Sequence, residues 1–201
     1  GLPQYIYVFY AQALGTTWFD VSVLMFAAIA FAFVRRWRNE DRDGRLEVAL
    51  SAPYSRSALV VERLAGLTLV AAIFAIFSGL AVGFTSRAQD LAIDSTRLAD
   101  ACLLLLVFGI VLGAAGSLFV AWWPRAAPAV FGGFVLAAYL DDQIGGALGW
   151  PGWVQHVSPF RLVGAPLAAG LDAGSLALLL ALAVAGAGIS ILLMQRRDVA
   201  R

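Results

Sequence analysis

The sequence contains no lysine, one cysteine and one histidine among its 201 residues. Without lysine it has no G-x-x-x-x-G-K-[ST] loop of the kind that holds ATP phosphates. The single cysteine, Cys102, excludes an intrachain disulfide framework, and His156 alone gives no cluster of histidine and cysteine metal ligands. We therefore expect no ATP site and no metal site within this chain.

Charged residues are also scarce. They make up 13% of the chain, while 61% of the residues are hydrophobic and the net charge is +1. A soluble domain has roughly half its residues apolar and about a quarter charged, so the composition excludes the usual globular class. The small net charge gives no field that would attract nucleic acid. The composition predicts an all-α integral membrane protein.

Long apolar stretches predict about five transmembrane helices. A bilayer core about 30 Å thick requires roughly 20 apolar residues in a helix. Ala126–Leu140 is shorter and covers only about 22 Å at 1.5 Å per residue, so it either crosses a thinned bilayer or turns back. The predicted spans are Thr17–Val34, Leu64–Phe84, Ala101–Ala121, Ala126–Leu140 and Gly174–Met194.

The arginines indicate the orientation, because cytoplasmic loops collect basic residues. If Ala126–Leu140 crosses, eleven of the fourteen arginines lie on one side, and only Arg87, Arg97 and Arg161 lie on the other. If it turns back, the C-terminal arginines change side and the asymmetry weakens. We favour the crossing, which places Gly1 outside and the C-terminus in the cytoplasm.

Two other patterns concern packing and the outer surface. The pairs Gly79/Gly83 and Gly109/Gly113 lie one helical turn apart, a spacing that allows helix backbones to approach closely in lipid. Glycine is also simply frequent in membrane helices. The segment 141–172 is rich in Trp, Pro and Gly, which predicts short interfacial helices or a re-entrant loop at the outer surface.

The segment between the first two spans has a helical pattern. Leu46, Ala49, Leu50 and Pro53 follow the spacing i, i+3, i+4, i+7 of one apolar helix face. Pro53 ends such a helix, and Ser55 is placed to cap the next one. We call residues 43–56 the coupling segment. The pattern alone favours an interfacial helix that anchors a loop to lipid, since amphipathic helices of this kind are common.

Three motifs in this order resemble type-2 ABC exporter permeases, most closely those described as exporters of polyketide antibiotics. The first combines Glu40, Gly44-Arg45, Glu47, Leu50-Ser51-Ala52-Pro53 and Ser55-Arg56. The others are Ser158-Pro159-Phe160 before the last span and Arg196-Arg197-Asp198 at the end. The match covers spans two to six of a six-helix half, so a further helix is expected before Gly1.

The resemblance implies a transmembrane subunit in a bacterial plasma membrane that exports a hydrophobic or amphipathic compound. A separate ABC ATPase would bind ATP and Mg²⁺ and dock on the coupling segment, and a second permease half would complete the pathway. Glu47 and Arg56 are the candidates for polar contacts, and Leu46 and Leu50 for apolar ones. The predicted docking residues are Arg45, Leu46, Glu47, Leu50, Ser51, Pro53, Ser55 and Arg56.

Asp141 and Asp142 are the candidate residues of a substrate pathway, because an acidic pair near the membrane can bind a cation or carry protons. Such residues also commonly end a helix at the water boundary. A secondary carrier and a membrane scaffold without transport therefore remain alternatives to the exporter. His156 and Ser158 do not make a serine hydrolase, because no G-x-S-x-G is present. The chain is not expected to be an enzyme by itself.

Overall fold

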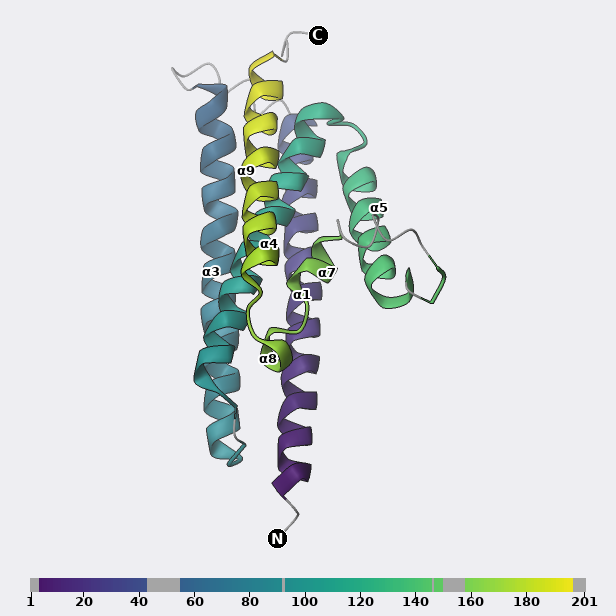
Figure 1. Cartoon of the computed structure of the whole chain (residues 1–201). Coiled ribbons are helices and arrows are strands. Elements are labelled where there is room, and N and C mark those ends of the chain that lie inside the picture. Colours follow the sequence, from purple (N-terminus) through teal and green to yellow (C-terminus); the bar gives the residue numbers. More distant parts are fainter. Residues whose placement is uncertain (1–3, 43–54, 92, 146, 150–157, 197–201) are drawn as a thin grey trace.

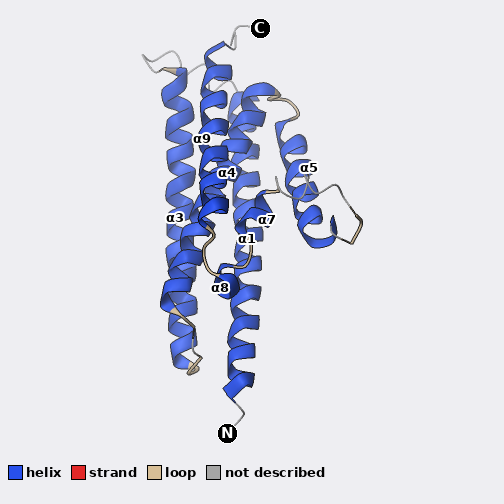
Figure 2. Ribbon diagram, viewed as in Figure 1, coloured by secondary structure: helices blue, strands red, loops and turns tan. Residues whose placement is uncertain are grey.

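The structure, a computed structural model, describes residues 4–42, 55–91, 93–145, 147–149 and 158–196. All regular structure in these residues is helical (Figure 2). The four long helices are α1 (Gln4–Arg42), α3 (Arg56–Ala88), α4 (Ser95–Trp122) and α9 (Ala173–Arg196). The shorter ones are α5 (Ala127–Leu140), its continuation as the π-helix η1 (Asp141–Gly145), α7 (Pro159–Val163) and α8 (Pro166–Ala169).

The four long helices lie alongside one another as an elongated bundle, with the two chain termini at opposite ends (Figure 1). α5 descends beside the bundle and ends partway along it; α7 lies at a similar level, and α8 lies farther toward the end of the bundle where α1 begins. α4 is central, because it packs against α1, α3, α5, α7, α8 and α9. The core of the protein therefore surrounds α4.

The four long helices confirm four of the predicted spans. Each contains a stretch long and apolar enough to cross a membrane: Thr17–Glu40, Ser57–Ala88, Ser95–Trp122 and Ala173–Arg196. The helices extend beyond the predicted limits, because charged residues mark the edge of the lipid but do not end a helix. The chain is an all-α integral membrane protein, as predicted.

Caps mark where two of these helices begin. The Ser55 side chain accepts a hydrogen bond from the Ala58 backbone N–H at 3.1 Å at the start of α3. The Asp94 side chain accepts one from the Thr96 N–H at 2.9 Å at the start of α4. Each cap pairs one of the backbone donors that have no partner in the first turn of a helix. The prediction that Ser55 caps the second span is confirmed.

The fifth predicted span forms a helix that is shorter than the other four. α5 has 14 residues, with a proline in its first turn, and at 1.5 Å per residue it covers about 21 Å. This is less than the bilayer core, about 30 Å, and α5 is not among the four helices long enough to cross. The bundle thus has four full-length spans and one short flanking helix.

Glycines bring α4 close to its neighbours, as their spacing predicted. A Cβ on Gly116 would lie 2.5 Å from Cγ2 of Val34 on α1, and one on Gly109 would lie 2.8 Å from the Phe26 ring. A Cβ on Gly79 of α3 would meet the thiol of Cys102. Small residues at these positions allow the helix backbones to approach closely, and Cys102 is a packing residue.

The outward faces of the long helices are apolar. Large exposed side chains there include Phe77 and Phe84 on α3, and Val184 and Leu192 on α9. On a soluble protein so many exposed apolar residues would form an aggregation-prone patch. Facing lipid, they are the expected surface of a membrane bundle.

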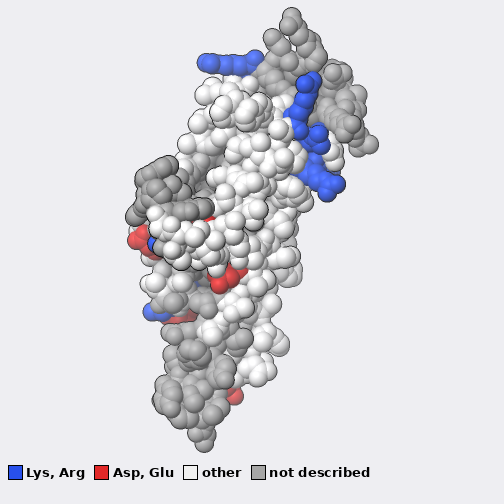
Figure 3. Space-filling view, turned by 90° about the vertical axis from the view of Figure 1, so that its right-hand side faces the viewer, with Lys and Arg blue, Asp and Glu red and all other residues white. Residues whose placement is uncertain are grey.

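Arginine side chains gather at one end of the bundle, which we call the basic end (Figure 3). This end comprises the last turns of α1, the start of α3, the α4–α5 turn and the end of α9. It carries Arg35, Arg36, Arg38, Arg63, Arg125 and Arg196. The end of α1 and the start of α3 both lie at the basic end. The coupling segment connects these two helix ends in the sequence.

Candidate functional site

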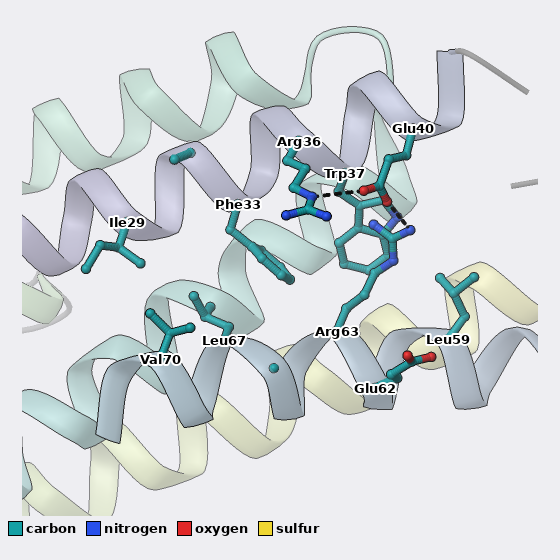
Figure 4. Close-up of a pocket in the computed structure, with 12 residues that line it drawn as sticks. Ile29, Phe33, Arg36, Trp37, Glu40, Leu59, Glu62, Arg63, Leu67 and Val70 are labelled. Carbon is teal, nitrogen blue, oxygen red and sulfur yellow. Dashed lines mark hydrogen bonds and ion pairs between the residues drawn. The ribbon is translucent and has the colours of Figure 1, made fainter. Parts of the chain in front are cut away.

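A groove lies between α1 and α3 at the basic end (Figure 4). It has a volume of about 770 Å³, within the range of small-molecule sites. Apolar side chains from both helices form its walls, and Gly66, which has no side chain, widens it. The wall residues include Ile29 and Phe33 of α1 and Leu59, Leu67 and Val70 of α3.

Charged side chains close the groove at its basic end. One carboxylate oxygen of Glu40 accepts a hydrogen bond from Nε of Arg36 at 3.0 Å. The other oxygen lies 2.5 Å from Nη2 of Arg63, which comes from α3 (Figure 4). The Arg63 guanidinium also lies over the Trp37 ring, 4.9 Å from its centroid. We call Glu40, Arg63 and Trp37 the α1–α3 clamp, since they join the two helices.

The clamp is partly shielded from solvent. The side chains of Arg63 and Glu40 are 20% and 25% exposed, and Trp37 is buried. Shielding strengthens an ion pair relative to one in open water, although it does not reach the strength of a pair in a dry interior. The cation–π contact adds attraction that salt screens less readily. The clamp therefore fixes the end of α1 against the start of α3.

In the sequence, Trp37 and Glu40 of the clamp precede the coupling segment, and Arg63 follows it. Arg45, Leu46, Glu47, Leu50, Ser51 and Pro53 all lie outside the described residues, so their predicted docking role stays a prediction. Ser55 is exposed and caps α3, and Arg56 is the first residue of that helix. Of the predicted docking residues, Ser55 thus has an identified structural role.

Sequence reasoning singled out Glu40 as part of a motif but missed Arg63 and Trp37 as its companions. The pairing of Arg36 with Glu40 was readable, because residues four apart face each other on a helix. Arg63 was not, because its contact requires α1 and α3 to be neighbours at this level. Only the bundle geometry brings these two residues together.

The two residues of the predicted substrate pathway face different surroundings. Asp141 is 2% exposed, and among the described residues neither of its carboxylate oxygens has a hydrogen-bond partner. Asp142 is exposed by comparison. Burial raises the pKa of the Asp142 carboxyl, Arg161 acts to lower it, and the negative charges of Asp20 and Asp141 raise it further. Asp20, Asp141 and Arg161 are therefore each close enough to Asp142 to act on it electrostatically.

The Ser158-Pro159-Phe160 motif packs α7 against α5 and α4. The buried Ser158 hydroxyl donates a hydrogen bond to the Ala138 carbonyl at 3.0 Å. The Phe160 ring packs edge-on against Phe108 at 5.1 Å and Tyr139 at 5.7 Å between centroids. Since its proton is used in this way, Ser158 is a packing residue and not a nucleophile.

No group of three or more His, Cys, Asp and Glu side chains in the described part of the chain is arranged to hold a metal ion.

Comparison with known proteins identifies the family. A model of the family described as "Multidrug efflux system permease Rv1217c, C-terminal domain" matches residues 9–194, nearly the whole chain. A comparison with curated proteins found no match. The matched range covers three of the four full-length spans entirely and the fourth up to residue 194, together with the groove, the α1–α3 clamp and η1. The chain belongs to the family of the C-terminal domain of the multidrug efflux system permease Rv1217c.

Proposed function

We propose that this chain is the transmembrane part of an ATP-driven ABC exporter that moves hydrophobic or amphipathic compounds out of the cell by alternating access. The family supports a multidrug efflux permease. The three motifs of the sequence support the ABC class. ATP and Mg²⁺ would bind to a separate ABC ATPase, and a second permease half, in another copy or in the same polypeptide, would complete the pathway.

The proposal rests on the contact between Glu40 and Arg63. An ATPase that moves the coupling segment applies force to the end of α1 and the start of α3. Because the clamp joins these two helices, they would respond as one unit. Both helices also pack on α4, which would pass the motion to the rest of the bundle. The clamp is thus suited to couple a cytoplasmic event to the membrane helices.

The basic end supports the orientation. Basic residues accumulate on the cytoplasmic side of membrane proteins. With the basic end in the cytoplasm of a bacterial cell, the coupling segment and the C-terminus face the compartment that contains ATP. The groove, at the same end of α1 and α3, is then placed to admit an amphipathic compound from the inner leaflet. Its apolar walls suit a hydrophobic body, and its charged end suits a polar head.

The test is affinity purification of the full-length protein in mild detergent, followed by mass spectrometry. We expect a stoichiometric ABC ATPase, lost when Glu47→Ala and Arg56→Ala are combined. Arg87→Ala is the matched control, because Arg87 lies at the other end of α3. A preparation without ATPase, under conditions where a known permease–ATPase complex survives, would contradict the exporter proposal.

One observation favours a secondary carrier as the second candidate. Asp141 is a buried acidic residue without a hydrogen-bond partner, and carriers use such groups to bind substrate or coupling ions. The carrier and the exporter differ in their energy source, which an inhibitor experiment distinguishes. Export that stops when a protonophore collapses the proton gradient, and continues when ATP is depleted, would favour the carrier. The reverse pattern would favour the exporter.

A further inference from the structure

Asp141 is the least satisfied acidic side chain among the residues that the structure describes. It is 2% exposed, and neither Oδ1 nor Oδ2 has a hydrogen-bond partner. Leaving a buried carboxyl group unpaired costs free energy, which a positive charge or a hydrogen-bond donor offsets. The nearby Ser158 hydroxyl donates to the Ala138 carbonyl, so it does not serve Asp141. Because no described residue donates a hydrogen bond to the Asp141 carboxyl group, that group is open to a bound ligand.

The position of Asp141 on its helix shows which way it faces. The buried residues of α5 and η1 include Ala127, Phe131, Ala138, Asp141 and Gly145, whose separations of 4, 7, 3 and 4 define one helix face. α5 packs with α1 and α4, and the Phe131 ring lies 6.2 Å from that of Phe119 on α4. Asp141 therefore points toward the bundle and not toward lipid.

Asp20 on α1 and Asp141 act electrostatically on the neighbouring Asp142, and Arg161 on α7 opposes them. Carboxylates in a membrane protein favour a cationic partner. No three of the described acidic groups are placed to hold a metal ion.

We infer that Asp141 and the adjacent Asp142 form a binding site for a lipophilic organic cation at the end of α5 distant from the basic end. The inference rests on the proposed function in taking this cation to be a transported compound. A cation that enters supplies the partner that the buried carboxylate lacks. Neutral and anionic compounds of the same shape gain no such contact.

The site lies at the start of a π-helix. α5 ends at Leu140 and the chain continues as η1 from Asp141 to Gly145. The wider turn of a π-helix moves successive side chains away from their α-helical directions, and such turns are frequent at functional sites. Here the first η1 residue is buried and the second is exposed, so one carboxylate lies inside and the other lies at the entrance.

The probe for this site is tetraphenylphosphonium, a lipophilic cation, with tetraphenylborate as an anion of the same shape. Binding to the purified full-length protein in detergent is measured by equilibrium dialysis without ATP. We expect Asp141→Asn to weaken tetraphenylphosphonium binding by about tenfold or more, the effect of one lost charged contact. Asp142→Asn should weaken it less, because that side chain is more exposed. Tetraphenylborate binding should not decrease in either variant.

Two further variants keep the test decisive. Asp141→Glu retains the charge and should retain most of the binding, whereas a purely structural role would be disturbed by the longer side chain. Asp90→Asn is the matched control, because Asp90 is exposed in the turn after α3, and its φ of 53° is readily adopted by asparagine. Wild-type protein that binds the cation no better than Asp141→Asn would overturn the inference.

The binding measurement does not depend on ATP, so it separates this inference from the proposed function. Asp141-dependent cation binding in a protein that recovers no ABC ATPase would support the site and contradict the exporter. Recovery of the ATPase, together with cation binding that is unchanged in Asp141→Asn, would support the exporter and overturn the site.

Discussion

Glu40 and Arg63 form an ion pair across the gap between two helices that are connected through the coupling segment. The carboxylate and guanidinium lie 2.5 Å apart, and the same guanidinium lies over the Trp37 ring. The pair joins the two ends of the stretch that contains the coupling segment, for which the sequence motif predicts ATPase docking. Its position suggests that it transmits motion between the coupling segment and the spans more than it stabilises the fold.

The first prediction follows from this difference between stability and coupling. Glu40→Gln and Arg63→Gln should each lower the free energy of unfolding by no more than about 1 kcal/mol, because the pair is partly exposed. Transport should fall severalfold, since α1 and α3 no longer move together. Melting temperature and efflux of a fluorescent substrate are measured on the same preparations.

The double variant tests whether the two residues act through each other. If they do, Glu40→Gln combined with Arg63→Gln should lower transport no further than the stronger single change. Arg125→Gln is the control, because Arg125 is an exposed arginine at the same end, in the α4–α5 turn. Additive losses, or an equal loss in the control, would contradict a role for the pair in coupling.

The second prediction concerns close packing along α4. Gly116→Ala places a methyl group 2.5 Å from Cγ2 of Val34, a β-branched side chain with little freedom to move. Overpacking of this kind destabilises a protein by about 1–3 kcal/mol. Thermal unfolding followed by fluorescence-detected size exclusion should show a clear decrease in melting temperature.

Gly133→Ala is the matched control for that change. Gly133 also lies in a helix, but a Cβ there would meet nothing within 4 Å. Alanine favours a helix over glycine by roughly 0.5–1 kcal/mol, so this variant should be as stable as the wild type or more stable. Equal melting temperatures for the two variants would show that Gly116 is not needed for the contact between α1 and α4.

The sequence allowed the four long spans to be predicted because length and apolarity alone decide whether a helix can cross a bilayer. It also marked Gly79 and Gly109 as packing positions, through the spacing of the glycine pairs to which they belong. It did not reveal that Asp141 is buried while Asp142 is exposed. That difference depends on which face of α5 and η1 packs against α1 and α4, and the residues of this stretch alone do not specify that face.

The site was partly predictable for a similar reason. Glu40 was found because it belongs to a motif, whereas Arg63 and Trp37 acquire their roles only when α1 and α3 meet. Contacts between residues of different helices depend on the rotation of each helix about its axis. A short charged stretch does not specify that rotation, and the packing around α4 does.

The third prediction concerns Ser158. Ser158→Ala removes the buried hydrogen bond to the Ala138 carbonyl and should cost about 0.5–1 kcal/mol. The cost stays small because the Asp141 backbone N–H also donates to that carbonyl. Transport by the folded fraction should be retained. Ser95→Ala, an exposed serine at the start of α4, is the control. Loss of transport without loss of stability would contradict the packing role.

The fourth prediction is a pH dependence that arises from Asp142. Burial raises its pKa in the folded protein, and the charges of Asp20 and Asp141 act in the same direction, against Arg161. The folded state therefore takes up this proton at a higher pH than the unfolded state does. It follows that, as the pH falls through the raised value toward about 3.9, the ordinary value for Asp, this group makes the folded protein more stable.

Asp142→Asn removes that contribution, because the amide does not titrate. The difference in melting temperature, wild type minus Asp142→Asn, should therefore rise as the pH is lowered from 7 toward 4.5. The same series with Asp90→Asn corrects for the titration of exposed carboxylates elsewhere. A difference that stays constant or falls over this range would mean that Asp142 is no harder to ionise in the folded protein. The entrance to the proposed cation site would then lack the electrostatic character that its neighbours give it.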